Sequence, residues 1–110
     1  MTISSFALTV TPTAIFTSIG TSVVSVGYFC NIDPAGSQSF SLWLVQNGQD
    51  PGDNNIVYKD FSMTVGETYV IDREKIVLDN GDSVYANCSA NVSATLSTFS
   101  QSRIKTWEDF

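Results

Sequence analysis

The sequence predicts an all-β fold, a single antiparallel β-sandwich with jelly-roll-like or immunoglobulin-like connections. Two observations lead to this prediction. Short runs of alternating apolar and polar residues recur along the chain, and turns rich in Gly, Pro and Asn separate them at intervals of about ten residues. The chain of 110 residues suits one domain with one core, and no internal repeat is visible. We assign residues 1–100 to the sandwich and 101–110 to a C-terminal arm.

The first third of the chain predicts three strands, at 6–10, 14–18 and 22–32. Pro12 ends the first of them, because proline has no N–H to give to a ladder. The third is the longest alternating run. We expect its core face to be formed by five alternate residues: Val24, Val26, Tyr28, Cys30 and Ile32.

A type I turn is expected at 33–36, where Asp, Pro and Gly occupy the positions that they favour. The strand predicted at 39–46 follows this turn. Its serines favour a register with Phe40, Leu42 and Leu44 inward, whereas the reverse register would bury Trp43 and Val45. Residues 47–55 then form a polar loop with two strong breaker pairs.

The second half of the chain repeats short strands and tight turns. Short β-type runs lie at 56–58, 68–71, 75–78, 83–88 and 92–98, and for the whole chain we expect roughly eight strands. The Asn-Gly pair within 79–82 is typical of a hairpin turn. We also expect the last two strands to form a hairpin that turns near Ala90 and Asn91.

The charge of the chain limits its partners. The net charge is −6 and the whole chain has five basic residues, so we expect no binding to nucleic acid or to anionic membranes. No apolar run is long enough to span a bilayer. The first residues lack the basic and apolar regions of a signal peptide, which predicts synthesis and use in the cytosol or release by lysis.

Residue types that usually carry catalysis are scarce. The sequence has no histidine, which removes the commonest general base and most zinc sites. A carboxylate pair is still able to hydrolyse glycosides, but every acidic residue lies in or beside a predicted turn or in the tail. We therefore expect no enzymatic activity and no cofactor.

One loop offers oxygen ligands for calcium. Asp50, Asp53, Asn54 and Asn55 are weak metal candidates, because Ca²⁺ binds several carboxylate and carbonyl oxygens on flexible loops. Their spacing matches no EF-hand loop, and Asx-rich loops are commonly plain turns. The acidic turn at 79–82 has the same two interpretations.

The aromatic residues and cysteines each allow two interpretations. Trp43, Tyr58, Tyr69 and Tyr85 would form a platform for sugar rings in a glycan-binding module, or would pack in the core and across strands. Cys30 and Cys88 would close a long disulfide loop, but a cytosolic chain favours two reduced core thiols.

The C-terminal arm, 101–110, concentrates charge together with large apolar residues. Trp and Arg are enriched at binding hot spots, so we expect an interface that includes Arg103, Ile104, Trp107 and Phe110. The alternative is that the arm folds back and buries Trp107 on its own domain. An assembly contact would fit a homo-oligomer, a dimer or trimer, with edge strands or the arm at its interface.

Six segments resemble a family of small virion proteins of tailed bacteriophages, of the type found in cyanophages and other aquatic phages. They cover strand and turn signatures over roughly residues 5 to 99: YFCN at 28–31, NIVY at 55–58, GETYVID at 66–72, KIVL at 75–78, GDSV at 81–84 and ANCSA at 86–90. The arm from Gln101 departs from the family pattern.

The resemblance implies a structural role in the virion, after synthesis in the host cytoplasm. It implies a capsid decoration or cement protein that stabilises the head by binding between capsomers, with the major capsid protein as partner. A neck, tail or fibre accessory protein is the alternative within the virion, and a free glycan-binding module is the alternative outside it. The resemblance implies no catalytic residues.

Overall fold

The computed structural model describes residues 2–73 and 75–100, and it confirms the all-β sandwich. No helix occurs in these residues, so none that could cross a membrane is present among them. The strands are β1 (Thr2–Ala7), β2 (Thr13–Thr17), β3 (Ser22–Asn31), β4 (Gln38–Val45), β5 (Ile56–Met63), β6 (Thr68–Ile71), β7 (Ile76–Leu78), β8 (Ser83–Cys88) and β9 (Val92–Ser100).

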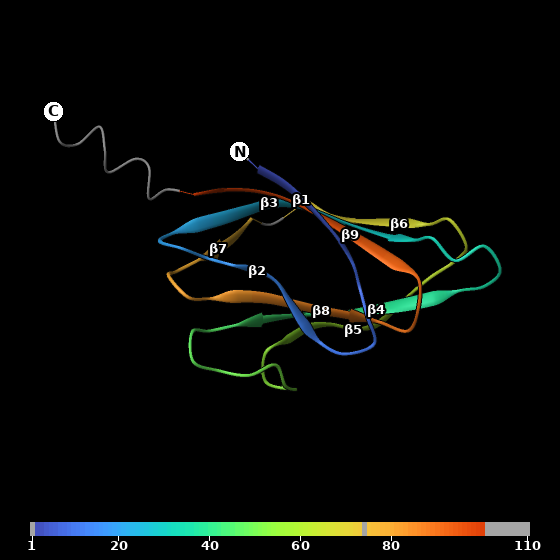
Figure 1. Cartoon of the computed structure of the whole chain (residues 1–110), viewed down its shortest axis with the longest axis horizontal. Coiled ribbons are helices and arrows are strands. Elements are labelled where there is room, and N and C mark those ends of the chain that lie inside the picture. The colour runs from blue at the N-terminus through green and yellow to red at the C-terminus, as the bar shows by residue number, and fades with distance from the viewer. Residues whose placement is uncertain (1, 74, 101–110) are drawn as a thin grey trace, which may run out of the picture.

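The strands form two antiparallel sheets, seen as two layers in Figure 1. Sheet A has the order β1-β9-β3-β6, with β7 also on β3, and sheet B has the order β2-β8-β4-β5. β6 pairs with Gly27–Cys30 of β3 and β7 with Ser22–Val24, so the two are halves of one interrupted edge strand. Counted as one, they give the orders 1-8-3-6 and 2-7-4-5, which are those of an eight-stranded jelly roll. Of the two predicted sandwich types, the structure has the jelly roll.

The predicted hairpin between the last two strands is wrong. β8 lies in sheet B and β9 in sheet A, so the turn at Asn91, where φ is +48°, carries the chain from one sheet to the other. The turn at 79–82 likewise connects β7 of sheet A with β8 of sheet B. Turn residues reverse the chain, but they do not determine which strand pairs with the one that follows.

Aromatic rings join the two sheets in the core. Phe29 of β3 stacks on Phe40 of β4, with ring centroids 4.3 Å apart and ring planes 4° from parallel. Phe40 also contacts the rings of Tyr58, Phe61 and Tyr69, which come from the edge strands β5 and β6. Aliphatic side chains of both sheets complete this core.

The predicted core face of β3 is confirmed at Val24 and wrong for the residues after it, and a β-bulge explains the change. Val24 pairs with Thr98 but Val26 pairs with Ser97, so β3 holds one extra residue at this point and its alternation changes phase. Val24 and Phe29 therefore both point into the core, whereas Tyr28 and Ile32 are exposed. Val26 and Cys30 lie on the same outer face of the sheet as Tyr28.

The favoured register of β4 is confirmed, with Phe40 and Leu42 in the core and Leu44 packed against it. The opposite face is buried as well, since Trp43 is only 8% exposed and Val45 only 3%. β4 lies between β8 and β5, and Trp43 faces Tyr85 and Ile56 across the two strand pairs. Because both faces of this central strand are buried, large apolar residues occur on both of them. Apolar residues alone therefore do not show which face of β4 meets the core.

Asn31 and Asp33 organise one end of the sandwich. The Asn31 amide is fully buried and donates to the carbonyl oxygens of Gly36, Met63 and Thr64, each at 3.1 Å. The Asp33 carboxylate accepts bonds from the Asn91 side chain and from nearby backbone N–H groups, and these bonds lower the pKa of Asp33 below its ordinary value. These two side chains join turns that are distant in the sequence.

The two cysteines are free thiols in different environments. Cys88 is buried in the core, as expected, and burial raises the pKa of its thiol. Cys30 is half-buried on the outer face of sheet A, so the prediction of a core position is wrong for this residue. Cys30 lies on the outer face because the bulge in β3 reverses the alternation of the residues that follow it.

Candidate functional site

The outer face of sheet A is a surface without charge, which we call the neutral face. The register of the strands places on it Ile3, Ser5 and Ala7 of β1, Val23, Val26, Tyr28 and Cys30 of β3, Thr68 and Val70 of β6, Val77 of β7, and Ser93, Thr95, Ser97 and Phe99 of β9. All of these residues are apolar, aromatic or hydroxyl-bearing. In the part of the chain that the structure describes, charged side chains approach this face at its border, at Asp72 and Lys75 in the segment between β6 and β7.

Several large apolar side chains of the neutral face are exposed. Ile3 is 72% and Val77 62% exposed, and Tyr28, Val70 and Phe99 are each about 40% exposed. Across the centre of the face, Ser5, Thr95, Tyr28 and Val70 follow one another from β1 to β6. Exposed apolar groups therefore occur on every strand of this sheet, interleaved with hydroxyl groups. Apolar groups gathered on one face are typical of a surface that another molecule covers.

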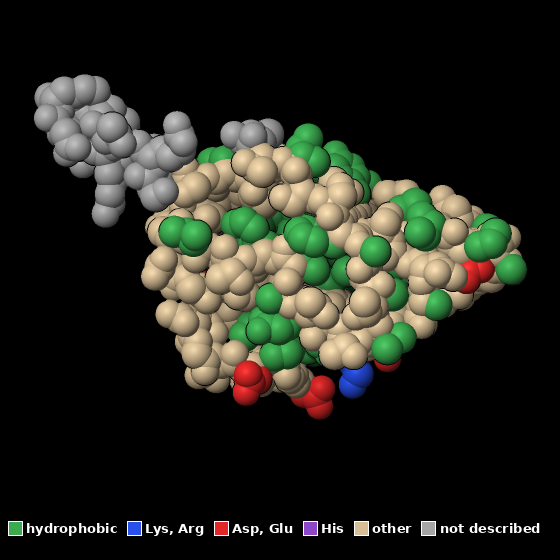
Figure 2. All heavy atoms as spheres, in the orientation of Figure 1, with side chains coloured by type: hydrophobic (Ala, Val, Ile, Leu, Met, Phe, Trp, Pro, Cys, Tyr) green, Lys and Arg blue, Asp and Glu red, His purple; other side chains and the backbone are tan. Residues whose placement is uncertain are grey.

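Charge in the described part of the chain is confined to loops and to one strand. β5 alone among the strands carries charged residues, Lys59 and Asp60. Residues 1–32 and 83–100 contain none. In the view of Figure 2, the charged side chains lie along the lower border and at one tip, and the rest of the visible surface is apolar or uncharged. This segregation leaves sheet A available for a neutral contact.

The sequence held a signal for the neutral face. Val26, Tyr28 and Cys30 alternate along β3 as core residues do, and this alternation predicts a core position for them. In the structure the opposite side of β3 faces the core through Val24 and Phe29. β3 is apolar on both faces, but only one of them meets the core of this domain. The apolar outer face therefore indicates a surface that a binding partner would bury.

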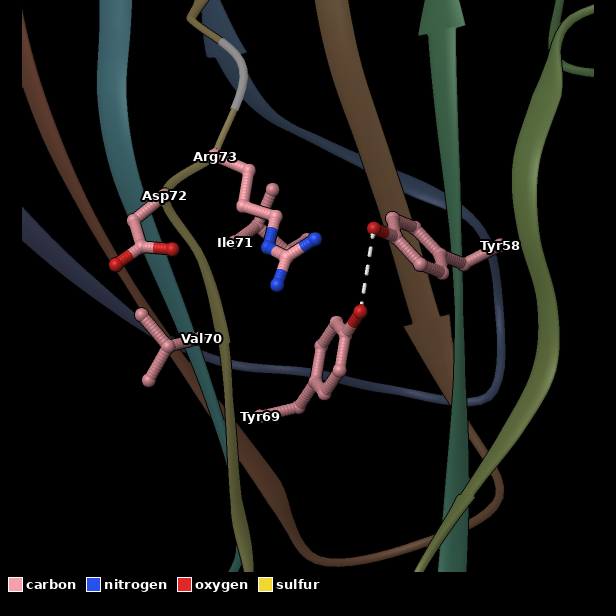
Figure 3. A pocket seen from close by; sticks show the side chains of 6 residues that line it. All are labelled: Tyr58, Tyr69, Val70, Ile71, Asp72 and Arg73. Carbon is pink, nitrogen blue, oxygen red and sulfur yellow. Dashed lines mark hydrogen bonds between the residues drawn. The ribbon is translucent and has the colours of Figure 1, made fainter.

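A second candidate site is the cleft between the edge strands β5 and β6, shown in Figure 3. Its volume is about 510 Å³, and Tyr58, Tyr69, Ile71 and Arg73 are among the residues that line it. The hydroxyl oxygens of Tyr58 and Tyr69 lie 3.5 Å apart, and their rings meet edge to face at 69°. The two phenols come from different sheets, so the cleft depends on sheet packing.

Arg73 gives the cleft a positive charge. Its guanidinium points toward the two tyrosine hydroxyls, whereas the Asp72 carboxylate points away (Figure 3). Arg73 is exposed and forms no ion pair with any other described residue. A guanidinium beside two hydroxyls is suited to bind a ligand that presents hydroxyl or carboxylate oxygens.

The predicted aromatic platform is only partly assembled. Tyr58 and Tyr69 come together in the cleft, but their edge-to-face packing offers no flat pair of rings for stacking. Trp43 and Tyr85 are neighbours across β4 and β8, on the outer face of sheet B, and Trp43 is buried. The four aromatics therefore belong to two separate places.

The loop at 47–55, which contains the four weak calcium candidates, is stabilised by the side chain of one of them, Asn55. The Asn55 side chain accepts the Gly52 N–H at 2.9 Å and donates to the Asp50 carbonyl oxygen at 2.9 Å. The amide oxygen of Asn55 thus accepts a bond from the loop backbone, three residues earlier in the chain. Within residues 2–73 and 75–100 no group of three or more His, Cys, Asp or Glu side chains is placed to hold a metal ion.

The predicted interface of the C-terminal arm, with Arg103, Ile104, Trp107 and Phe110, lies outside the described residues. Ser100, the last described residue, is among those that line a smaller cleft of about 260 Å³ between the ends of β1, β2 and β9.

Comparison with known proteins gives no relative, since no family model, no curated protein and no solved structure matches the chain.

Proposed function

We propose that this protein is a structural subunit without enzymatic activity, which binds a larger protein assembly through the neutral face of sheet A. The observation that carries the proposal is the absence of charged residues from the outer face of all five strands of that sheet. Exposed apolar groups on this face are unfavourable in water, and covering the face requires no desolvation of charged side chains.

The energetics favour covering the neutral face with protein. Burying an unpaired charge is expensive, and the cores of interfaces are accordingly depleted of charged residues and enriched in aromatic ones. Covering the neutral face removes Ile3, Val77 and Phe99 from water with no charge to desolvate. Its serine and threonine hydroxyls are able to exchange water for partner groups.

We assign the assembly to the virion of a tailed phage, and the protein to decoration or cementing of the capsid between capsomers. The sequence resemblance supports this setting, and so does fold-level analogy, since jelly rolls recur in viral capsid proteins. The mechanism would be mass action, because a protein that binds only the assembled lattice stabilises it against dissociation. Repeated symmetric sites would multiply a modest contact.

A charge placed at the centre of the neutral face tests the proposal. Tyr28→Lys should leave the fold intact, because this side chain points outward, and should weaken binding to particles at least about tenfold. Val57→Lys is the control, since Val57 is an apolar residue of sheet B that is 51% exposed. The measurement is the amount of each variant in purified particles of the phage that encodes the chain, by quantitative mass spectrometry.

The same particles separate the positions within a virion. Several hundred wild-type copies per particle would indicate head decoration, whereas roughly a dozen or fewer would indicate a neck, tail or fibre position and overturn the cement assignment. Absence of the protein from particles would refute the virion setting. Equal incorporation of the Tyr28→Lys and Val57→Lys variants would refute docking through the neutral face.

Glycan binding is a second candidate function, and the convergence of Tyr58, Tyr69 and Arg73 in one cleft favours it. Lectins also use jelly rolls, which is again fold-level analogy. Oxygen-rich sugars, acidic ones above all, would match a guanidinium beside two phenol hydroxyls.

A glycan array of neutral and acidic sugars checks the cleft. We expect any binding to fall about tenfold in Tyr69→Phe, which keeps the ring and removes only the hydroxyl, and further in Arg73→Ala. Tyr85→Phe and Lys59→Ala serve as controls outside the cleft. A blank array, or binding that all four variants retain, would count against this function.

A further inference from the structure

Within residues 2–73 and 75–100, the edge of sheet A at β1 shows none of the features that usually prevent strand pairing. Natural edge strands are protected by charge, proline, bulges or short length. β1 has six residues, an unbroken register with β9 from Thr2 to Ala7, and no charged residue or proline. It is therefore a ready template for another strand.

The other three edges of the sandwich are protected. β2 follows Pro12 closely and is bulged between Ala14 and Phe16. β5 carries Lys59 and Asp60, with Asp60 at a positive φ of 49°, and its pairing with β4 is irregular. β6 and β7 are short pieces separated by a charged segment. The lack of protection at β1 is thus specific to this edge.

The backbone of β1 shows which groups face outward. Leu8 donates its N–H to the Val92 carbonyl oxygen at 3.0 Å, so Leu8 and Val92 form a hydrogen-bonded pair. In an antiparallel ladder such pairs recur every second residue, at Phe6 and Ser4. The N–H and C=O groups of Ile3, Ser5 and Ala7 therefore point away from β9, and no bond from them to another described residue lies outside the sheet ladder.

We propose that β1 pairs antiparallel with β1 of a second copy across a two-fold axis at Ser5. Ser5 would pair with Ser5 of the partner, and Ile3 with the partner's Ala7, so that a large side chain meets a small one. About six backbone hydrogen bonds would form. Two five-stranded sheets would become one sheet of ten strands.

A second copy fits this edge because of the distribution of charge. Each copy has a net charge of −6, so two copies meet favourably only where neither presents carboxylates. Residues 1–32 and 83–100, which supply β1 and its neighbours β9 and β3, contain no charged residue. Pairing at β1 would also extend the neutral face continuously across both copies. Pairing at β1 depends on the exposed edge of that strand and does not depend on the virion assignment.

Sedimentation of the purified full chain over a concentration series tests the pairing. We expect a species of twice the 12.0 kDa chain mass, and a dissociation constant raised at least about tenfold by Ser5→Pro or Ser5→Lys. The proline removes an N–H that faces away from β9, so the monomer should keep its circular dichroism spectrum. Ser5→Ala keeps the N–H and should dimerise like the wild type.

Cross-linking gives a second readout that does not require a destabilising variant. In a Cys30→Ser background, Ser5→Cys should form a disulfide dimer under mild oxidation, while Ser62→Cys on the protected edge strand β5 should not. A wild type that stays monomeric at all concentrations would overturn the proposal. A dimer that Ser5→Pro and Ser5→Lys leave unchanged would also overturn it, as would equal cross-linking at Ser5 and Ser62.

Discussion

Replacing Asn31 with alanine should lower the free energy of unfolding by about 3 kcal/mol, because each buried polar group left unpaired costs roughly 1–3 kcal/mol. The substitution removes the donor shared by the carbonyl oxygens of Gly36, Met63 and Thr64, and the acceptor of the Asp33 N–H at 2.9 Å. These groups lie in turns that Asn31 connects. Urea unfolding followed by fluorescence measures the change.

Asn87→Ala is the matched control for this prediction. The Asn87 amide donates at 3.1 Å to one carbonyl oxygen, that of Val10, in an exposed position. Its loss should change stability by about 0.5 kcal/mol or less. An Asn31→Ala variant as stable as Asn87→Ala would show that the turns are held by other contacts.

The other large expected effect concerns the ring stack between the sheets. Phe40→Ala should cost about 4 kcal/mol of unfolding free energy, the usual range for a buried phenylalanine. Phe40 is 1% exposed, stacks on Phe29 of the opposite sheet and contacts the rings of Tyr58, Phe61 and Tyr69. Its removal would leave a cavity between the sheets and loosen the cleft at β5 and β6.

Phe99→Ala provides the comparison for the core phenylalanine. Phe99 lies on the neutral face and is 38% exposed, so the same truncation there should cost well under half as much, about 1 kcal/mol. Chemical denaturation of both variants under identical conditions gives the difference. Similar losses for the two variants would mean that the stack between the sheets is not a main source of stability.

The β-sandwich was predictable because alternation and turn chemistry are local properties. Residues 22–32, 68–71 and 83–88 show them clearly, and each contains or forms a strand. The jelly-roll connectivity was not predictable in the same way. Asn91 marks a turn, but whether β9 pairs with β8 or crosses to β3 depends on contacts between distant segments.

For the candidate sites too, local sequence patterns were predictable and contacts between distant segments were not. The bulge between Val24 and Val26 inverted the predicted faces of β3 beyond Val24. Its one local sign is Gly27, because a glycine inside a strand often marks a bulge, but the glycine does not show which residue is the extra one. The meeting of Tyr58 with Tyr69 likewise requires that two sheets pack against each other. Sequence patterns identified the aromatic residues as candidates, but only the packing determines which of them share a cleft.

The placement of the acidic residues has a consequence for the free protein. Asp33 and Glu67 lie in turns at one end of the sandwich, and Asp50, Asp53, Asp79 and Asp82 lie in loops at the other. Carboxylates favour colloidal solubility, because like-charged molecules repel at the distances where precipitation begins. A molecule with most of its described carboxylates at its two ends, and none on the outer face of sheet A, can stay dispersed at high concentration until that face meets a complementary surface. After binding, both ends remain in water.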